Sequence, residues 1–212
     1  MDGESWVDGY ELRLLDRRHE SVKWARQKMS NTIVSHNGLK IAGYEIIEVY
    51  QVLNSDLWNQ YRIRRDEIRQ DIGGRVKEVR LFHGTNFARS ITEDGFKVNL
   101  ASDKGMFGKG IYFADLSSKS NQYTFEGCNK PCKQHNEVYC SDCERTMLIC
   151  RVAMGAEYKA RDAMNGIKAP PSGYHTVVAE PGVCKNIKYP EYVIYDDNQA
   201  YPGYLVKYKI KK

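Results

Sequence analysis

The segment 81–123 holds the residues of this sequence that are best suited to chemistry. It contains His83-Gly84 after a strand-like run, a glycine-rich stretch at 105–110, and Tyr112 and Tyr123, which are eleven residues apart. Glycine lets backbone N–H groups approach a phosphate closely, which first suggests nucleotide binding. A dinucleotide fingerprint, however, requires G-x-G-x-x-G between a strand and a helix, whereas G-x-x-G-x-G here enters a strand. The segment therefore predicts a pocket that is not of the Rossmann type.

A second set of residues is suited to binding a metal ion. Its members follow the pattern C-x2-H-x4-C-x2-C and are Cys132, His135, Cys140 and Cys143. Two short chelating pairs joined by a tight loop fit tetrahedral Zn²⁺, and with every position filled by protein the ion would be structural. Cys128 is an alternative ligand to Cys132. We expect a zinc-binding loop at 128–143 that serves folding rather than catalysis, while Cys150 and Cys184 pack as small apolar groups.

Length and composition favour one intracellular domain. A chain of 212 residues can form one domain with a sizeable core. Its mean hydropathy of -0.61 and the lack of a long apolar run exclude a transmembrane helix. Residues 1–6 include no basic region followed by an apolar stretch, so no signal peptide is expected. Intracellular thiols stay reduced, which favours a metal site over disulfides. We expect a cytoplasmic or nuclear protein.

The charged residues give the chain a modest positive charge. The net charge of +5 arises from 32 basic and 27 acidic side chains. Basic residues gather at 62–69 of a predicted helix that continues to residue 72, and Asp66, Glu67 and Asp71 of the same helix are interleaved with them. This alternation is typical of a solvated helix face, so direct nucleic-acid binding is not expected. A modestly basic surface would still attract a ligand that carries a pyrophosphate.

Apolar spacing predicts an α+β domain. Residues 1–40 would form an N-terminal helical extension, because apolar residues recur at helical spacing over 12–29, and residues 41–212 the main domain. Further helices are expected at 57–72, 87–94 and 117–123, and strands at 44–52, 79–82, 111–114, 146–154, 175–178, 191–195 and 204–210. The stretch 97–110 would be a long loop that could close over the pocket. Since helices and strands do not alternate regularly, antiparallel sheets are favoured over a parallel doubly wound sheet.

Four blocks of the sequence carry a family resemblance. They are His83-Gly84-Thr85, Gly108-Lys109-Gly110-Ile111-Tyr112-Phe113-Ala114, Ser118-Lys119-Ser120-Asn121-Gln122-Tyr123 and Glu191-Tyr192-Val193-Ile194-Tyr195. In this order they resemble the catalytic domain of poly(ADP-ribose) polymerases, and most closely the tankyrases, which share the spacing of the Cys and His cluster. The resemblance runs from roughly residue 43 to the C-terminus. It implies the ADP-ribosyltransferase fold, with two antiparallel sheets around an NAD cleft, flanking helices and a small zinc-binding loop.

The resemblance implies an enzyme that transfers ADP-ribose from NAD⁺ to proteins and to growing ADP-ribose chains, with release of nicotinamide. Cleavage of NAD⁺ passes through an oxocarbenium-like ribose, which needs a nearby carboxylate as in glycoside hydrolysis. By resemblance, Glu191 would be that carboxylate and would also polarise the acceptor hydroxyl. His83 and Tyr112 would complete the catalytic set.

The same resemblance assigns residues to NAD⁺ binding. Tyr112 and Tyr123 would sandwich the nicotinamide ring through stacking and cation–π attraction. Gly84 and Ser120 would bind the carboxamide, and a side chain at position 84 would crowd the ring. His83 would hydrogen-bond a ribose hydroxyl and so orient the donor.

Alternatives remain open within this resemblance. Mono-transferring members generally carry an apolar residue in place of Glu191, so its presence permits polymer formation without guaranteeing it. The alternatives are a mono-ADP-ribosyltransferase and an inactive module that binds NAD or ADP-ribose. Transfer of an RNA 2′-phosphate is disfavoured, because it calls for basic residues where Glu191 stands. Residues 99–104 depart from the tankyrase pattern, and no ankyrin repeat is visible. Expected partners are NAD⁺ and protein substrates, including the chain itself, without a membrane.

Overall fold

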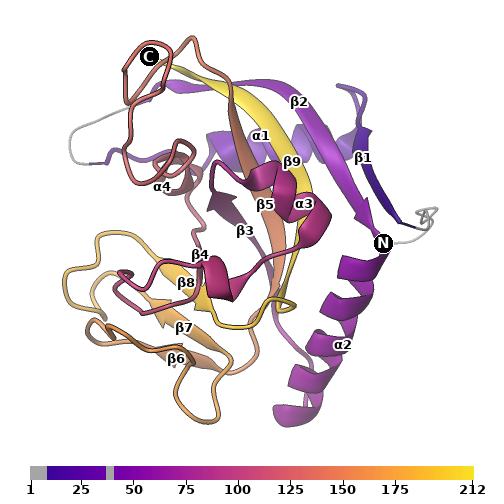
Figure 1. Ribbon diagram of the computed structural model, residues 1–212, viewed down its shortest axis with the longest axis vertical. Helices are drawn as coiled ribbons and strands as arrows, with labels where there is room; N and C mark the ends of the chain where they lie inside the picture. The colour runs from indigo at the N-terminus through magenta and orange to yellow at the C-terminus, as the bar shows by residue number, and fades with distance from the viewer. Residues whose placement is uncertain (1–8, 37–40) are drawn as a thin grey trace.

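The computed structural model describes residues 9–36 and 41–212, which fold around two β-sheets (Figure 1). The expectation of no signal peptide and the boundary expected at residue 40 fall on residues outside the described ranges. The helices are α1 (Glu20–Ser30), α2 (Ser55–Asp71), α3 (Ala88–Asp94), the 3₁₀ helix η1 (Val98–Leu100) and α4 (Ser117–Asn121). The strands are β1 (Tyr10–Leu14), β2 (Gly43–Asn54), β3 (Glu78–Gly84), β4 (Ile111–Phe113), β5 (Arg145–Ala153), β6 (Glu157–Lys159), β7 (Thr176–Ala179), β8 (Glu191–Ile194) and β9 (Ala200–Lys211).

Both sheets consist mainly of antiparallel strands. The first has the order β1-β2-β9-β5-β3 and the second β4-β8-β7-β6. Strands β6 and β7 run parallel, with Glu157 beside Thr176, so the expectation of antiparallel sheets is wrong for this pair. The sheets meet near the end of β3, where Phe82 exchanges two backbone hydrogen bonds with Ala114 (2.8 and 3.0 Å). This junction places the end of β3 beside β4.

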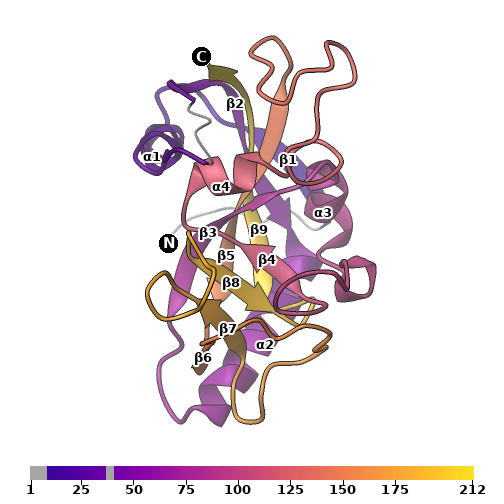
Figure 2. The ribbon, with the colours of Figure 1, turned by 90° about the vertical axis from the view of Figure 1, so that its left-hand side faces the viewer.

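The two faces of the first sheet pack against different elements. Side chains alternate between the faces of a strand, so Phe82 of β3 packs toward α1 whereas Leu81 packs toward α3 and the second sheet. Figure 2 shows α1 and α3 on opposite sides of this sheet. Helix α2 buries Tyr61 completely, in a cluster that includes Tyr201 of β9. The end of β3 therefore sits between two packed layers.

The helix expected over 12–29 is wrong in its first part. Residues Tyr10–Leu14 form β1, the edge strand of the first sheet, which pairs antiparallel with β2. Leu12 matches a helical spacing by coincidence, because pairing with β2 overrides local preference. The helix is α1 alone, and its buried residues are Val22, Ala25 and Met29, as expected. Strand β1 shares a sheet with β2, while the division at residue 40 stays a prediction.

Most other elements lie where the sequence predicts them. Helix α2 begins after Asn54, whose side-chain oxygen accepts a hydrogen bond from the Leu57 N–H (3.1 Å) and so caps the helix. Two elements were missed, namely β6 and the 3₁₀ turn Val98–Leu100 inside the expected long loop. Among the described helices, none combines the length and the apolar character that crossing a membrane requires.

Candidate active site

His83 stands at the end of β3 in a defined protonation state. Its Nδ1 lies 2.8 Å from the backbone oxygen of Tyr112, and because a carbonyl only accepts, Nδ1 carries the proton. The rings of Phe96 and Phe113 flank the imidazole at centroid distances of 5.2 and 5.5 Å. Burial among these groups lowers the pKa of His83, although the bond to Tyr112 acts in the opposite sense. A neutral His83 therefore presents Nε2 as an acceptor for a hydroxyl.

Close packing against α4 explains why a glycine is required at position 84. A Cβ at this position would lie 1.8 Å from the backbone oxygen of Ser120 and 2.7 Å from its carbonyl carbon. Real Cβ atoms do not approach backbone so closely. Helix α4 therefore packs directly on the end of β3, which brings the backbone of Ser120 beside Gly84. The crowding that the structure shows at position 84 comes from this helix.

Tyr112 fastens the glycine-rich segment. Its hydroxyl donates to the backbone oxygen of Gly108 and accepts from the N–H of Phe107, each at 2.9 Å. A Cβ at Gly105 would lie 2.1 Å from this hydroxyl oxygen, so the glycine makes room for the phenol. Burial raises the pKa of Tyr112 to about 12, and the nearby carboxylate of Glu191 acts in the same direction. The hydroxyl of Tyr112 thus holds the glycine-rich segment through two backbone groups.

Residues 107–109, at the end of the expected loop, are held by further hydrogen bonds and by close packing. The Tyr195 hydroxyl donates to the backbone oxygen of Phe107 at 2.6 Å. Gly108 has a φ of +68°, and a Cβ there would lie 2.0 Å from the backbone oxygen of Ile167, which accepts from the Lys109 N–H at 2.8 Å. Only glycine fits this combination of left-handed backbone and close approach. The part of the loop next to β4 is therefore a fixed wall of the site.

Glu191 opens β8 and forms an ion pair with Lys119 of α4. The Nζ and Oε1 atoms are 2.9 Å apart, and the side chains are only 18% and 15% exposed. Burial lowers the pKa of Lys119, but Glu191 together with smaller contributions from Tyr123 and Cys128 outweighs it, so the pKa is raised. The site residues predicted from the sequence did not include Lys119. Its position between Ser118 and Ser120, in the third resembling block, was the feature of the sequence that could have indicated it.

Lys119 also reaches the second tyrosine of the site. Its Nζ lies 5.7 Å from the centroid of the Tyr123 ring, within the range of cation–π attraction. Burial raises the pKa of Tyr123 to about 12, and the positive charge of Lys119 opposes this rise. Tyr123 is still 36% exposed, so one part of its ring remains open to a ligand.

Residues 29–36 contact α4 through its first two residues. The Ser117 hydroxyl donates to the backbone oxygen of Met29 (2.7 Å), and His36 Nε2 lies 2.8 Å from the Ser118 hydroxyl. The His36 ring also packs on Tyr189, with centroids 4.2 Å apart. Burial, with a smaller contribution from Lys119, lowers the pKa of His36 to about 4. His36 therefore contacts the residue before Lys119 and the residue two positions before Glu191, another feature that the sequence did not reveal.

The four predicted metal ligands converge. Their donor atoms all lie within 4.8 Å of one another. The Nδ1 atom of His135 lies 3.9, 3.2 and 3.4 Å from the sulfur atoms of Cys132, Cys140 and Cys143. Tetrahedral Zn²⁺, with bonds of about 2.3 Å to sulfur and about 2.0 Å to nitrogen, separates such atoms by about 3.5 Å. This donor set and spacing fit Zn²⁺. Cys128 instead lies 3.7 Å from Gln122 and is outside the cluster.

Arg145 joins this loop to the end of α4. Its guanidinium donates to the backbone oxygen of Val138 (2.9 Å) and to the Thr124 hydroxyl (3.0 Å). It also lies 4.1 Å from the centroid of the Phe125 ring. The side chain is buried, so these contacts satisfy a charge that would otherwise be costly. The metal-ligand loop and the segment after Tyr123 are thus held together.

Comparison with known proteins shows the family of the chain. The family model named Poly(ADP-ribose) polymerase catalytic domain matches residues 20–185 of the sequence. The chain belongs to this family. It carries the catalytic domain of an NAD⁺ ADP-ribosyltransferase, and the poly(ADP-ribose) polymerase fold accounts for its two sheets and few helices.

Individual relatives of this polymerase-type domain are distant. The chain is 26% identical over 188 residues to human protein mono-ADP-ribosyltransferase PARP14, which covers 84% of the chain and 10% of the relative. It is 30% identical over 182 residues to a probable poly(ADP-ribose) polymerase of Dictyostelium discoideum, covering 79% and 45%. It is 28% identical over 171 residues to human PARP12, another mono-ADP-ribosyltransferase, covering 78% and 22%. The chain spans less than half the length of each of these relatives.

Proposed function

We propose that the chain is a protein ADP-ribosyltransferase of the polymerase type, which transfers ADP-ribose from NAD⁺ to proteins and to ADP-ribose already attached. The observation that carries this proposal is the half-buried Glu191, held by Lys119 at 2.9 Å and close enough to Tyr112 to raise its pKa. A carboxylate held beside two tyrosines suits a reaction that develops positive charge on a ribose.

The nicotinamide end of NAD⁺ would bind between Tyr112 and Tyr123. Stacking on a cationic ring contributes about 1–2 kcal/mol per tyrosine when the contact excludes water. The backbone of Gly84 and the hydroxyl of Ser120 would bind the carboxamide. The hydrogen bond from His83 Nδ1 to the backbone oxygen of Tyr112 keeps the proton on Nδ1. The free Nε2 would then accept a hydrogen bond from a ribose hydroxyl.

The reaction would then exchange one bond at the ribose for another. The N-glycosidic bond breaks, and nicotinamide leaves with the electron pair as a neutral ring. The acceptor oxygen forms the new bond to the same carbon and releases its proton to the solvent. Glu191 would stabilise the oxocarbenium-like ribose and polarise the acceptor hydroxyl. Lys119 would keep the carboxylate in place during both events.

The product can be either an ADP-ribose polymer or a single ADP-ribose unit. Glu191 favours chain elongation, because the charged group can activate the hydroxyl of an attached ADP-ribose. The names of the relatives PARP14 and PARP12 favour transfer of a single unit. We place polymer formation first, since the carboxylate is both present and held. Automodification follows if a surface residue of another copy can reach the site.

The cluster of Cys132, His135, Cys140 and Cys143 would bind a structural Zn²⁺. Its donor spacing supports this role, and filled coordination leaves the ion outside the chemistry. The same cluster, together with Glu191, supports a tankyrase-like member of the family. A cytoplasmic or nuclear location fits reduced thiols in such a cluster.

The proposal is tested by incubating the purified chain with labelled NAD⁺ and resolving the protein on a denaturing gel. A high-mass smear supports polymer formation. A single discrete shift would replace it with mono-transfer. Absence of label, with intact nicotinamide-competitive binding of NAD⁺, would make the chain a binding module and overturn the proposed activity.

A further inference from the structure

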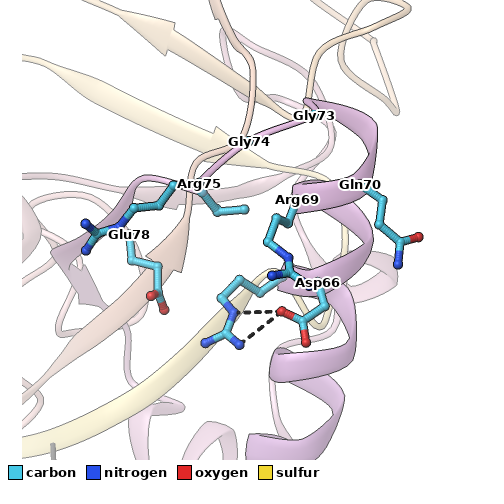
Figure 3. Close-up of a pocket in the computed structure, with 9 residues that line it drawn as sticks. Asp66, Arg69, Gln70, Gly73, Gly74, Arg75 and Glu78 are labelled. Carbon is cyan, nitrogen blue, oxygen red and sulfur yellow. Dashed lines mark hydrogen bonds and ion pairs between the residues drawn. The ribbon is translucent and has the colours of Figure 1, made fainter.

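Two adjoining grooves, with volumes of ≈ 610 and ≈ 600 Å³, run along the start of β3. They share Arg75, Val76 and Glu78, so they form one continuous depression, here called the β3 groove. In Figure 3 the side chain of Arg69 projects from α2 toward Arg75 and Glu78, whereas Gln70 points away. The β3 groove lies between α2 and the segment that leads into β3.

The β3 groove concentrates the positive charge of the chain. Its cationic side chains are Arg65, Arg69, Arg75, Lys77, Arg80 and Arg151. Its acidic side chains are Asp66 and Glu78. Lys77 pairs with Glu157, outside the lining, at 2.8 Å, so the groove holds a surplus of three positive charges once this pair is counted. Such a concentration is the electrostatic footprint of an anionic partner.

Both acidic groups of the groove are already engaged. Asp66 pairs with Arg65 at 3.1 Å. Glu78 accepts a hydrogen bond from the Tyr61 hydroxyl (2.5 Å) and lies 3.6 Å from Arg151. Within residues 9–36 and 41–212, no ion-pair partner is found for Arg69 or Arg75. The alternation of charges at 62–69 thus neutralises part of the helix face and leaves its last arginine available.

Two further arginines are held together at a cost. Arg80 of β3 lies directly opposite Arg151 of β5 in the antiparallel register, and like charges in such a position destabilise a sheet. Each guanidinium rests against an indole ring, Arg80 over Trp24 at 4.6 Å and Arg151 over Trp58 at 5.5 Å. Glu78 lies 3.6 Å from Arg151 and offsets part of this charge, whereas no ion-pair partner is found for Arg80 in the part of the chain that the structure describes. A bound anion would supply the missing counter-charge at Arg80.

We propose that the β3 groove binds an ADP-ribose chain through its pyrophosphates. Each unit of such a chain carries two adjacent phosphates, which match paired guanidinium groups that donate in a fixed fork. An open, continuous groove suits a linear ligand. Single-stranded RNA is the less fitting polyanion, because its binding sites add exposed aromatic rings for stacking, and the faces of Trp24 and Trp58 are covered by arginine. The inference rests on the proposed function, which supplies the ligand.

The β3 groove and the site lie on opposite faces of one strand. Side chains alternate along β3, so Arg80 shares a face with Phe82 and α1, whereas His83 faces Phe96 and Phe113. A chain bound in the groove therefore leaves the NAD⁺ site open. The groove would retain a protein that is already modified close to the enzyme that modifies it.

The test uses the full chain and a short labelled ADP-ribose polymer, with affinity measured by fluorescence anisotropy. The double variant Arg69→Glu/Arg75→Glu should bind the polymer at least about tenfold more weakly and show a smaller salt dependence, because two phosphate contacts are lost. The matched control Arg17→Glu/Lys168→Glu makes the same change in net charge at exposed positions outside the groove and should bind within about twofold of the unmodified chain.

The outcomes separate this inference from the proposed function. Equal weakening by both double variants would overturn a specific groove, and so would tighter binding of single-stranded RNA than of polymer. Nicotinamide release by Arg69→Glu/Arg75→Glu, at NAD⁺ concentrations where little product has formed, should match that of the unmodified chain. A chain that binds polymer through Arg69 and Arg75 but releases no nicotinamide would retain the groove and refute the activity.

Discussion

Lys119 and Glu191 form an ion pair of 2.9 Å between Nζ and Oε1, although one lies on α4 and the other opens β8. The pair closes the gap between two blocks that are distant in the sequence. It also connects the carboxylate to Tyr123, whose ring lies 5.7 Å from the same Nζ. The chemistry proposed for Glu191 depends on this positioning, because a carboxylate that can swing away no longer faces the developing charge.

Replacing Lys119 by Met should therefore lower kcat more than it raises KM. We expect kcat for nicotinamide release to fall by about tenfold to 100-fold, since an electrostatic group of the site loses its fixed position. KM for NAD⁺ should change by less, because the tyrosines remain. Lys130→Met, at an exposed lysine beyond α4, is the control and should resemble the unmodified chain. A Lys119→Met variant with unchanged kcat would show that the ion pair does not serve the reaction.

His36 should make the stability of the fold depend on acid. Burial lowers its pKa from 6.5 to about 4. Between pH 6.5 and about pH 4, the unfolded chain therefore binds a proton at His36 that the folded chain does not bind. The contribution of a neutral His36 is therefore complete above 6.5 and is lost as the pH falls toward 4. The loss amounts to up to about 3 kcal/mol.

The comparison of His36→Phe with the unmodified chain isolates this effect. Phe keeps a ring against Tyr189 but loses the bond to Ser118, which should cost about 1 kcal/mol at about pH 7. Urea unfolding at about pH 4.5 should then show an acid-induced loss that is smaller in the variant by about 2–3 kcal/mol. Equal acid losses in the two proteins would mean that His36 is protonated in the fold.

Tyr112, Ser120 and Tyr123 were selected through the family resemblance of the blocks that contain them, and their roles in NAD⁺ binding stay predictions. The elements that carry them, β4 and α4, follow each other along the chain and could be predicted locally. Lys119 was missed because its role depends on Glu191, and their contact requires the second sheet to fold against α4. His36 was missed for the same reason, since a lone histidine in a loop gives no sign that it will be buried.

The fold follows the same division. The helix α2 has a capping residue, Asn54, that can be read locally, whereas β1 was mistaken for helix because its partner strand β2 lies far along the chain. The short strand β6 was missed as well, and its parallel pairing with β7 depends on a connection that no local pattern describes. Long-range pairing overrides local preference in each case.

The metal cluster predicts a loss of stability when one ligand is removed. Cys140→Ser should abolish stoichiometric zinc in the purified chain and lower the melting temperature by several degrees, because the metal closes the loop that Arg145 ties to the end of α4. Cys128→Ser is the matched control, since that thiol lies outside the cluster, and should keep both. Metal content by mass spectrometry and thermal unfolding measure the two effects. A Cys140→Ser variant that melts like the unmodified chain would refute a structural ion.

The most direct measurement of the central claim is nicotinamide release by the Glu191→Gln variant. The amide keeps the shape of the side chain and loses its charge, so release should fall at least about 100-fold while NAD⁺ still competes with nicotinamide for the site. Glu45→Gln, at an exposed position of β2, should leave both quantities unchanged. Release by Glu191→Gln at the rate of the unmodified chain would contradict the role of this carboxylate and the mechanism built on it.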